Sequence, residues 1–333
     1  MDLTATYLGL SLRNPLIASP SPLSRTVAGV RRLAEAGVAA VVLPSLFEED
    51  ILEAERREGM LLDQGADVFP ESLSYFPETA APASSPEAYL RLIERAAGAV
   101  EIPVLASLNA ATPEGWAGLA HTMGEAGAAA IELNFYQLPA DLEMTSAAVE
   151  ARLLEAVQSA KAAARVPLAV KLVPYFSSLG EMAIRLDCAG ADGLILFNRW
   201  LQPEIDPETG RALPGIGLSA PIDGRLPRLW IALLRGRVMA SLAGSSGVES
   251  TQDLIQYLLA GADAVMTTSA LLRHGPDHAR SLLEGLMGWM AAHGLQRLAD
   301  IRTRAATAAR SAELRSTYVE ALRLANSLDQ GPW

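Results

Sequence analysis

A lysine at the end of an apolar segment is the first residue whose position suggests chemistry. Lys171 directly follows Leu168-Ala169-Val170, a short apolar run that predicts a buried strand. An unpaired ammonium group would be costly in such a place. Lys171 therefore either pairs with Glu132, which also lies near the end of a predicted strand, or faces a bound ligand. We favour the ligand-facing lysine.

Two later segments rich in small polar residues are candidates for binding an anion. Gly244-Ser245-Ser246-Gly247 and Thr267-Thr268-Ser269 each follow an apolar run. Small residues allow backbone N–H groups to approach an anion closely, and the start of a helix adds its dipole. A Gly-Ser-Ser-Gly sequence taken alone is also typical of a flexible loop, so its place in the fold matters.

The elements that would position these residues follow a regular pattern of eight apolar segments separated by helical patterns. Four of the helices end in Ala-Gly, where glycine can take the left-handed conformation that closes the last turn. The predicted strands are 15–19, 38–43, 102–107, 128–134, 167–172, 192–197, 237–243 and 262–267. Strands alternating with helices indicate parallel βαβ units. An open doubly wound sheet is the alternative to a closed barrel.

We predict a single (β/α)8 TIM barrel domain over residues 1–333, with the barrel at about 15–295 and a helical extension at 296–333. In this fold, chemistry is carried at the carboxyl ends of the strands, and phosphate groups commonly bind after strands seven and eight. The residues at the predicted strand ends are mostly small and polar: Ser19, Pro44, Ser107 with Asn109, Asn134, Lys171, Asn198, Gly244 and Thr267.

Two connections are long and follow strands, so we expect them to form walls of a pocket or a lid. They are residues 47–85, which contain Tyr75, and residues 198–223, which contain the turn sequence Asp206-Pro207-Glu208-Thr209-Gly210. Tyr75 could reach the pocket and act as a phenol acid.

The composition excludes several classes of partner. A net charge of −11 disfavours binding to nucleic acid or to an anionic membrane surface. No run of about 18 apolar residues is present. The single cysteine, Cys188, and the lack of a signal-peptide pattern suggest a cytoplasmic protein.

The four histidines do not indicate a metal site. His274 and His278 have i, i+4 spacing, but Pro276 lies between them and no acidic third ligand is evident. We expect these two residues, with His121 and His293, to lie on the surface, and we expect no bound metal.

Several motifs together resemble the dihydroorotate dehydrogenase family. They are Asn14-Pro15-Leu16-Ile17-Ala18-Ser19, Glu132-Leu133-Asn134, Val170-Lys171-Leu172-Val173-Pro174-Tyr175-Phe176, Asn198, Gly244-Ser245-Ser246-Gly247-Val248 and Thr268-Ser269-Ala270. The resemblance runs from residue 3 to about 300 and is closest to the soluble class 1 enzymes. It implies an FMN oxidoreductase of the CH-CH type, in pyrimidine metabolism, with a small-molecule substrate.

The resemblance also implies roles for individual residues. Lys171 would lie at the flavin N1/C2 carbonyl, where a cation stabilises the reduced anionic ring. The expected catalytic residues are Lys171, Asn134 and Tyr136. The expected FMN-binding residues are Ala18, Ser19, Ser45, Asn109, Asn134, Lys171, Asn198, Gly217, Gly244, Ser245, Ser246, Gly247, Thr268 and Ser269.

The chain departs from the family pattern where the family removes a proton from its substrate. Pro44-Ser45 stands where the family has a lysine at the end of strand two, and Phe135-Tyr136-Gln137-Leu138 lacks the family's cysteine or serine base. Tyr136 is the one titratable group there, and an unperturbed phenol, with a pKa of about 10, is a poor base at neutral pH. Ser246 and Thr268 replace two glycines of the family's phosphate loops. We therefore predict altered or weak activity on dihydroorotate.

Two other functions stay open at this point. One is an FMN-binding accessory protein without catalysis of its own, and the other is a flavin-free phosphate-binding barrel such as a lyase. A homodimer and an electron-transfer partner protein are also compatible with the sequence.

Overall fold

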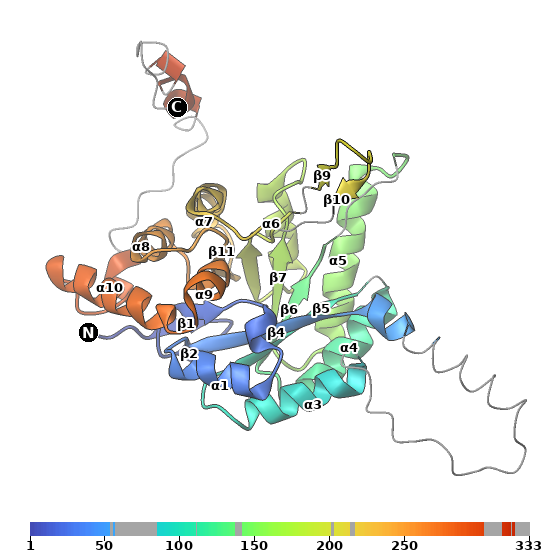
Figure 1. Ribbon diagram of the computed structural model, residues 1–333. Helices are drawn as coiled ribbons and strands as arrows, with labels where there is room; N and C mark the ends of the chain where they lie inside the picture. Colours follow the sequence, from blue (N-terminus) through green and yellow to red (C-terminus); the bar gives the residue numbers. More distant parts are fainter. Residues whose placement is uncertain are drawn as a thin grey trace, which may run out of the picture.

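Eight parallel strands form a closed barrel in the computed structural model (Figure 1). The structure describes residues 1–53, 56, 85–110, 112–136, 142–200, 203–213, 217–302, 315–320 and 322–323. The barrel strands, in order around the barrel, are β3 (Leu16–Ala18), β4 (Ala40–Phe47), β5 (Val104–Asn109), β6 (Ala130–Asn134), β7 (Leu168–Leu172), β8 (Gly193–Leu196), β11 (Ser241–Ser245) and β12 (Ala264–Thr267). The predicted (β/α)8 barrel is confirmed, because β12 closes the ring by pairing with β3.

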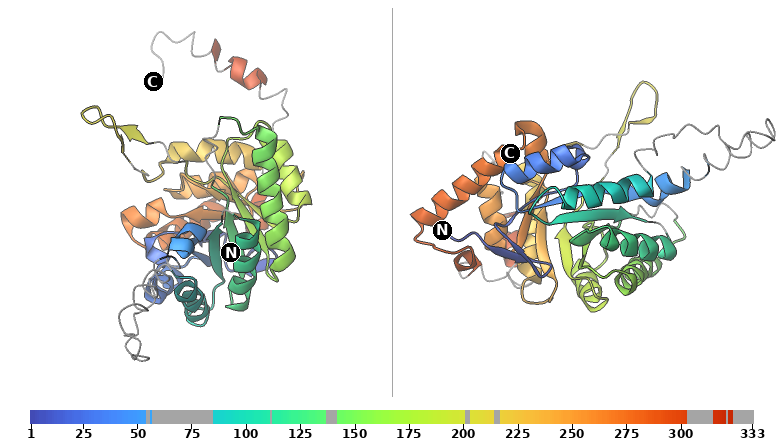
Figure 2. Two further views of the ribbon diagram at one scale, coloured as in Figure 1. Left: turned by 90° about the vertical axis from the view of Figure 1, so that its right-hand side faces the viewer. Right: turned by 90° about the horizontal axis from the view of Figure 1, so that it is seen from below.

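Helices lie on the outside of the strands (Figures 1 and 2). They are α1 (Val27–Glu35), α3 (Pro86–Ala97), α4 (Pro113–Glu125), α5 (Ser146–Ala163), α6 (Leu179–Cys188), α7 (Arg225–Leu234), α8 (Thr251–Ala260), α9 (Ser269–His274), α10 (His278–Ala292) and α11 (Ala299–Arg302), with the 3-10 turns η1 (Pro22–Ser24) and η2 (Pro221–Gly224). The four predicted Ala-Gly helix ends are present. Gly37, Gly127, Gly190 and Gly261 all have a φ of about +100°.

Several strand boundaries differ from the sequence prediction. β4 continues to Phe47 rather than ending at residue 43, and its register to β5 shifts between Val42 and Ser45. Pro44 lies within this shift, where its missing N–H interrupts the ladder without ending the strand. β5 likewise continues to Asn109, and the seventh barrel strand begins at Ser241 rather than 237. Ser45 is therefore a residue within a strand, not a loop residue.

An N-terminal hairpin closes the amino end of the barrel and was not predicted. β1 (Ala5–Tyr7) pairs with β2 (Leu10–Leu12) across a turn in which Leu8 and Gly9 both have positive φ. This is the geometry of a tight hairpin turn, but Leu-Gly lacks the usual Asn-Gly signal. Leu8 N donates to Ser241 Oγ at 3.1 Å, at the first residue of β11.

The connection after β8 contains a small hairpin that projects from the barrel (Figure 2). Its strands, β9 (Glu204–Ile205) and β10 (Ala212–Leu213), flank the predicted turn. Asp206 Oδ1 accepts from Glu208 N at 2.8 Å, so the turn prediction is confirmed. Most of the connection 47–85, including Tyr75, lies outside the described residues.

In the extension at 296–333, α11 buries Ile301, and residues 303–314, 321 and 324–333 lie outside the described part of the chain. Across the described ranges, none of the helices is both long and apolar enough to cross a membrane.

Candidate functional site

A cavity lies at the carboxyl ends of the barrel strands, among the segments that follow β3, β7, β8, β11 and β12. Many of the residues predicted to bind a cofactor line it: Ser19, Lys171, Asn198, Gly217, Ser245, Ser246, Thr268 and Ser269. These residues come from five different parts of the sequence, and the parallel barrel brings them together because all its strands end at one face.

Lys171 both lines this cavity and pairs with a buried carboxylate. Its Nζ lies 3.3 Å from Glu132 Oε1 and 3.5 Å from Ser19 Oγ. The Glu132 side chain is fully buried, whereas that of Lys171 is 9% exposed. The ion pair drawn from the sequence is therefore present, and the same side chain lines the cavity.

A chain of hydrogen bonds runs from the barrel mouth to this carboxylate. Asn198 Nδ2 donates to Asn134 Oδ1 at 2.6 Å, and Asn134 Nδ2 donates to Ser45 Oγ at 3.3 Å. The Ser45 and Ser107 hydroxyl oxygens are 2.7 Å apart, and Ser107 Oγ donates to Glu132 Oε1 at 3.3 Å. Glu132 and Asn134 are two residues apart on β6, so the pleat places both on the inner face. We call Asn198, Asn134, Ser45, Ser107 and Glu132 the polar chain.

The loop after β11 contains two successive residues with left-handed backbone. Ser246 and Gly247 both have positive φ, at 78° and 67°, so Ser246 takes a conformation that is usual for glycine. The hydroxyl of Tyr257 on α8 donates to Ser245 O at 3.0 Å and to Ser246 O at 2.7 Å. Burial raises the pKa of Tyr257 above its usual value, which keeps this donor protonated. The ring of Tyr257 also fills the space beside Gly244, where a Cβ would lie only 2.2 Å from it.

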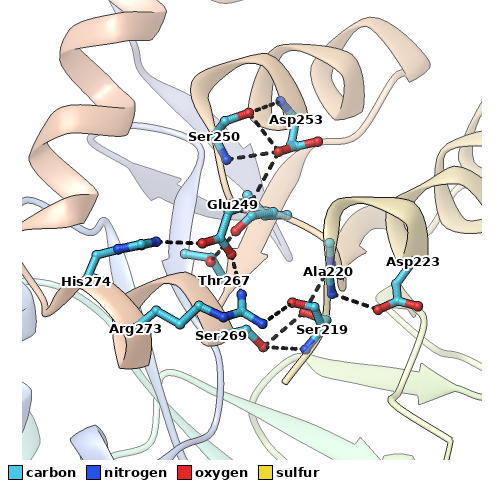
Figure 3. Close-up of polar contacts among 12 residues, drawn as sticks. Ser219, Ala220, Asp223, Glu249, Ser250, Asp253, Thr267, Ser269, Arg273 and His274 are labelled. Atoms are coloured by element: carbon cyan, nitrogen blue, oxygen red, sulfur yellow. Dashed lines mark hydrogen bonds and ion pairs between the residues drawn. The ribbon is translucent and has the colours of Figure 1, made fainter. Parts of the chain in front are cut away.

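Ser219, in the connection after β8, joins the two phosphate-loop candidates (Figure 3). Its backbone N–H and its hydroxyl both donate to Ser269 Oγ, at 2.9 and 3.0 Å. Gly247 N in turn donates to Ser219 Oγ at 3.2 Å. Ser219 lines the cavity, and sequence reasoning missed it because it lies far from any strand end.

Glu249, immediately after the phosphate-loop candidate, is held between two side chains of α9 (Figure 3). Arg273 Nη1 pairs with Glu249 Oε2, and its Nη2 donates to Ser219 O at 2.8 Å. His274 Nε2 lies 2.6 Å from Glu249 Oε1, and His278 Nε2 lies 2.8 Å from Glu249 O. This corrects the expectation that no acidic residue accompanies the two histidines. In the described part of the chain, however, no group of three or more His, Cys, Asp or Glu side chains is placed so that it could hold a metal ion.

The remaining predicted residues lie near the cavity but do not line it. Ala18 is buried in β3, so it can contribute only its backbone, and Asn109 lies at the end of β5 beside Phe47. Tyr136 packs on Trp200, with ring centroids 5.1 Å apart. Gln137 and Leu138 lie outside the described residues.

Arg199 is a further residue that the sequence did not indicate. It lines the cavity and pairs with Asp223, whose carboxylate also accepts from Ala220 N at 2.8 Å. In the sequence, the position of Arg199 directly after Asn198 was the only indication that it belongs to the site. An isolated arginine in a long connection is weak evidence for a binding residue.

Comparison with known proteins agrees with this arrangement. The sequence profile described as dihydroorotate dehydrogenase matches residues 65–290. A protein of Aeropyrum pernix named "Putative dihydroorotate dehydrogenase A (fumarate)" is 30% identical over 85% of this chain and 97% of its own length. The dihydroorotate dehydrogenase B (NAD(+)) catalytic subunit of Methanocella arvoryzae is 29% identical over 81% of this chain and 87% of its own. That of Methanothermobacter thermautotrophicus is 26% identical over 88% and 94%. This chain belongs to the dihydroorotate dehydrogenase family.

Proposed function

We propose that this protein is an FMN-dependent oxidoreductase that acts on dihydroorotate weakly or on a different substrate of the CH-CH type. Membership of the family supports the oxidoreductase class, because the relatives carry that activity in their names. The main structural support for the proposal is Lys171, whose ammonium group lines a cavity with hydroxyl-rich loops as its other walls.

The residues around the cavity fit FMN in two respects. Ser219, Ser246 and Ser269 line the cavity, and the Ser269 hydroxyl, which accepts from Ser219, can donate its own proton to one phosphate group. The left-handed backbone at Ser246 and Gly247 retains the shape that the family obtains from glycines, so the serine at 246 is compatible with such a loop. The sequence contains no dinucleotide motif, which favours FMN over FAD.

FMN, when bound, supplies the chemistry of accepting a hydride. Lys171 would stabilise negative charge on the flavin ring, because its ammonium is held by Glu132 and lies at the cavity wall. Asn134 and Asn198, which hydrogen-bond to each other at 2.6 Å, would orient the substrate through their remaining amide groups.

Weak activity on dihydroorotate follows from the residues that the family uses and this chain lacks. A positioned general base contributes about 10²–10⁴-fold to rate. Tyr136 is the titratable residue at the family's base position, and it packs on Trp200 outside the cavity lining. Neither Pro44 nor Ser45, which stand where the family has its lysine, carries a charge to bind a substrate carboxylate.

We further propose an electron-transfer partner protein, because two of the relatives are named as catalytic subunits. A flavin-free lyase differs from this proposal in carrying no FMN, and a non-catalytic FMN protein differs in that no substrate reduces its flavin.

Two measurements test the proposed function. The purified protein should be yellow, and boiling should release FMN; a colourless protein that takes up no added FMN would contradict the proposal and favour the flavin-free lyase. The second is anaerobic mixing of the oxidised protein with dihydroorotate, for which we expect flavin bleaching well below about 1 s⁻¹, an ordinary enzyme turnover rate. Bleaching at that rate or faster would show that the site retains full dihydroorotate chemistry.

A further inference from the structure

We propose that Ser45, Ser107 and Glu132 form a proton relay that takes the place of the missing base, with Glu132 as its terminal acceptor. This inference rests on the proposed function, because the relay works together with hydride transfer to FMN. It assigns a role to a fully buried carboxylate in β6.

The direction of the hydrogen bonds in the polar chain is fixed at its inner end. An ionised carboxylate can only accept, and the Lys171 ammonium can only donate. Ser107 Oγ therefore donates to Glu132 Oε1, and the short 2.7 Å contact then requires Ser45 to donate to Ser107. Both hydroxyl protons point toward the carboxylate, which is the arrangement that moves a proton inward.

The Glu132 carboxylate is incompletely compensated where it lies. Its Oε1 has two partners, Lys171 Nζ and Ser107 Oγ, both at 3.3 Å, which is long for charge-assisted hydrogen bonds of about 2.7–2.9 Å. Its Oε2 is buried and has no hydrogen-bond partner among the residues that the structure describes. A buried anion with an unused oxygen is costly, so this group is suited to accept a proton.

Ser45 is the outer end of the relay. It is half-buried in β4, whereas Ser107 and Glu132 are fully buried. A serine oxygen has two lone pairs. One accepts from Asn134 Nδ2, and the other is available to a proton delivered from the barrel mouth.

The reaction balances as a two-electron oxidation. One C–H bond of the substrate breaks as a proton that passes to Ser45 Oγ, while the Ser45 proton passes to Ser107 and the Ser107 proton to Glu132. The neighbouring C–H bond breaks with its electron pair, which leaves as hydride to oxidised FMN, and a C=C bond forms. A proton on Glu132 removes the anion beside Lys171, so the lysine charge becomes available to the reduced flavin.

The other titratable groups near Glu132 do not compete for this proton. Tyr7 on β1 and Tyr89 on α3 both feel its charge, and burial is the main cause that raises the pKa of each above its usual value. Both phenols stay protonated. Tyr89 OH also accepts from Ser107 N at 2.9 Å, which fixes the middle of the relay.

Proton uptake on reduction tests the relay without any substrate. The FMN-bound protein is reduced at an electrode in weakly buffered solution, separated from the counter electrode, and the change in pH gives the number of protons taken up. We expect two protons per FMN in the wild type, one on the flavin and one on Glu132, and one in Glu132→Gln. The midpoint potential should accordingly change by about 59 mV per pH unit in the wild type and by about 30 mV in the variant. One proton in both proteins would overturn the relay while leaving FMN binding intact, whereas a protein that binds no FMN would overturn both proposals.

Ser107→Ala keeps the ion pair and tests the path alone. The Ser107→Ala variant should still take up two protons per FMN. Uptake of the second proton should be at least about 10-fold slower than in the wild type, because the hydroxyl next to Glu132 is gone. Ser24→Ala is the matched control: its buried hydroxyl bonds to Ser21 O and Val42 O outside the relay, and its uptake should be as fast as in the wild type. If Glu132→Gln does not fold, the Ser107→Ala experiment tests the proposal on its own. A rate of proton uptake in Ser107→Ala equal to that of the wild type would overturn the proposal.

Discussion

Replacing Lys171 with methionine should destabilise the protein strongly, because it leaves Glu132 buried without its cation. At 3.3 Å and an effective dielectric constant of about 20, the attraction of the pair is about 5 kcal/mol. Breaking buried pairs by removing one partner costs about 3–5 kcal/mol in practice. We therefore expect Lys171→Met to lose about 3–5 kcal/mol of unfolding free energy, since methionine keeps most of the side-chain volume.

The measurement is urea unfolding of the flavin-free proteins, with fluorescence and circular dichroism required to give the same midpoint. The double variant Lys171→Met/Glu132→Gln removes both charges and should recover about 2 kcal/mol or more of the loss. Lys161→Met is the matched control: Lys161 pairs with Asp192 at 2.6 Å, but both side chains are about one-third exposed, so it should cost no more than about 1 kcal/mol. Equal losses in Lys171→Met and in the double variant would refute the energetic coupling of the pair.

Two further predictions concern the phosphate-loop candidate. Gly247→Ala should lower the unfolding free energy, measured with urea, by about 1–3 kcal/mol more than Gly236→Ala does. Both glycines have positive φ. A Cβ at residue 247 would lie 2.4 Å from Gly224 N, whereas a Cβ at residue 236 would have no atom within 4 Å. An equal cost would show that the loop has room to move. Tyr257→Phe removes the donor to Ser245 O and Ser246 O, so it should cost about 1–2 kcal/mol and weaken FMN binding severalfold in a titration. Because the pKa of Tyr257 is raised, the hydroxyl stays protonated and the weakening should be the same at about pH 6 and about pH 9; a loss of binding at one pH alone would contradict this role.

The barrel could be predicted from the sequence because its strands are mostly buried and apolar, and four of them are preceded by a recognisable helix end. Gly37, Gly127, Gly190 and Gly261 mark four of these ends, and all take the expected left-handed conformation. The N-terminal hairpin could not be predicted. Its turn uses Leu8 at positive φ, and burial of that leucine against the barrel stabilises a conformation that its residue type disfavours.

The site could be predicted only where a residue type is unusual for its position. Lys171 stood out because a charge followed an apolar strand. Glu132 also lies in a strand, but its importance depends on which strands neighbour β6 and on the pleat that turns it inward beside Ser107. Ser45 was obscured by Pro44, which suggested the end of a strand although the chain continues to pair with β5 beyond it. Contacts between strands depend on register, and register is a property of the folded barrel.

The two departures from the family pattern are connected through one residue. In the sequence, the loss of the strand-two lysine and the loss of the loop base concern separate segments. In the fold, Ser45, which with Pro44 stands where the family has its lysine, lies within hydrogen-bonding distance of both Asn134, which precedes the predicted base position, and Ser107, which leads to Glu132. A lysine there would have no hydroxyl to pass a proton inward. The serine instead joins the barrel mouth to a buried carboxylate, so the segment that lacks the family's lysine supplies a route for the substrate proton in place of the missing loop base.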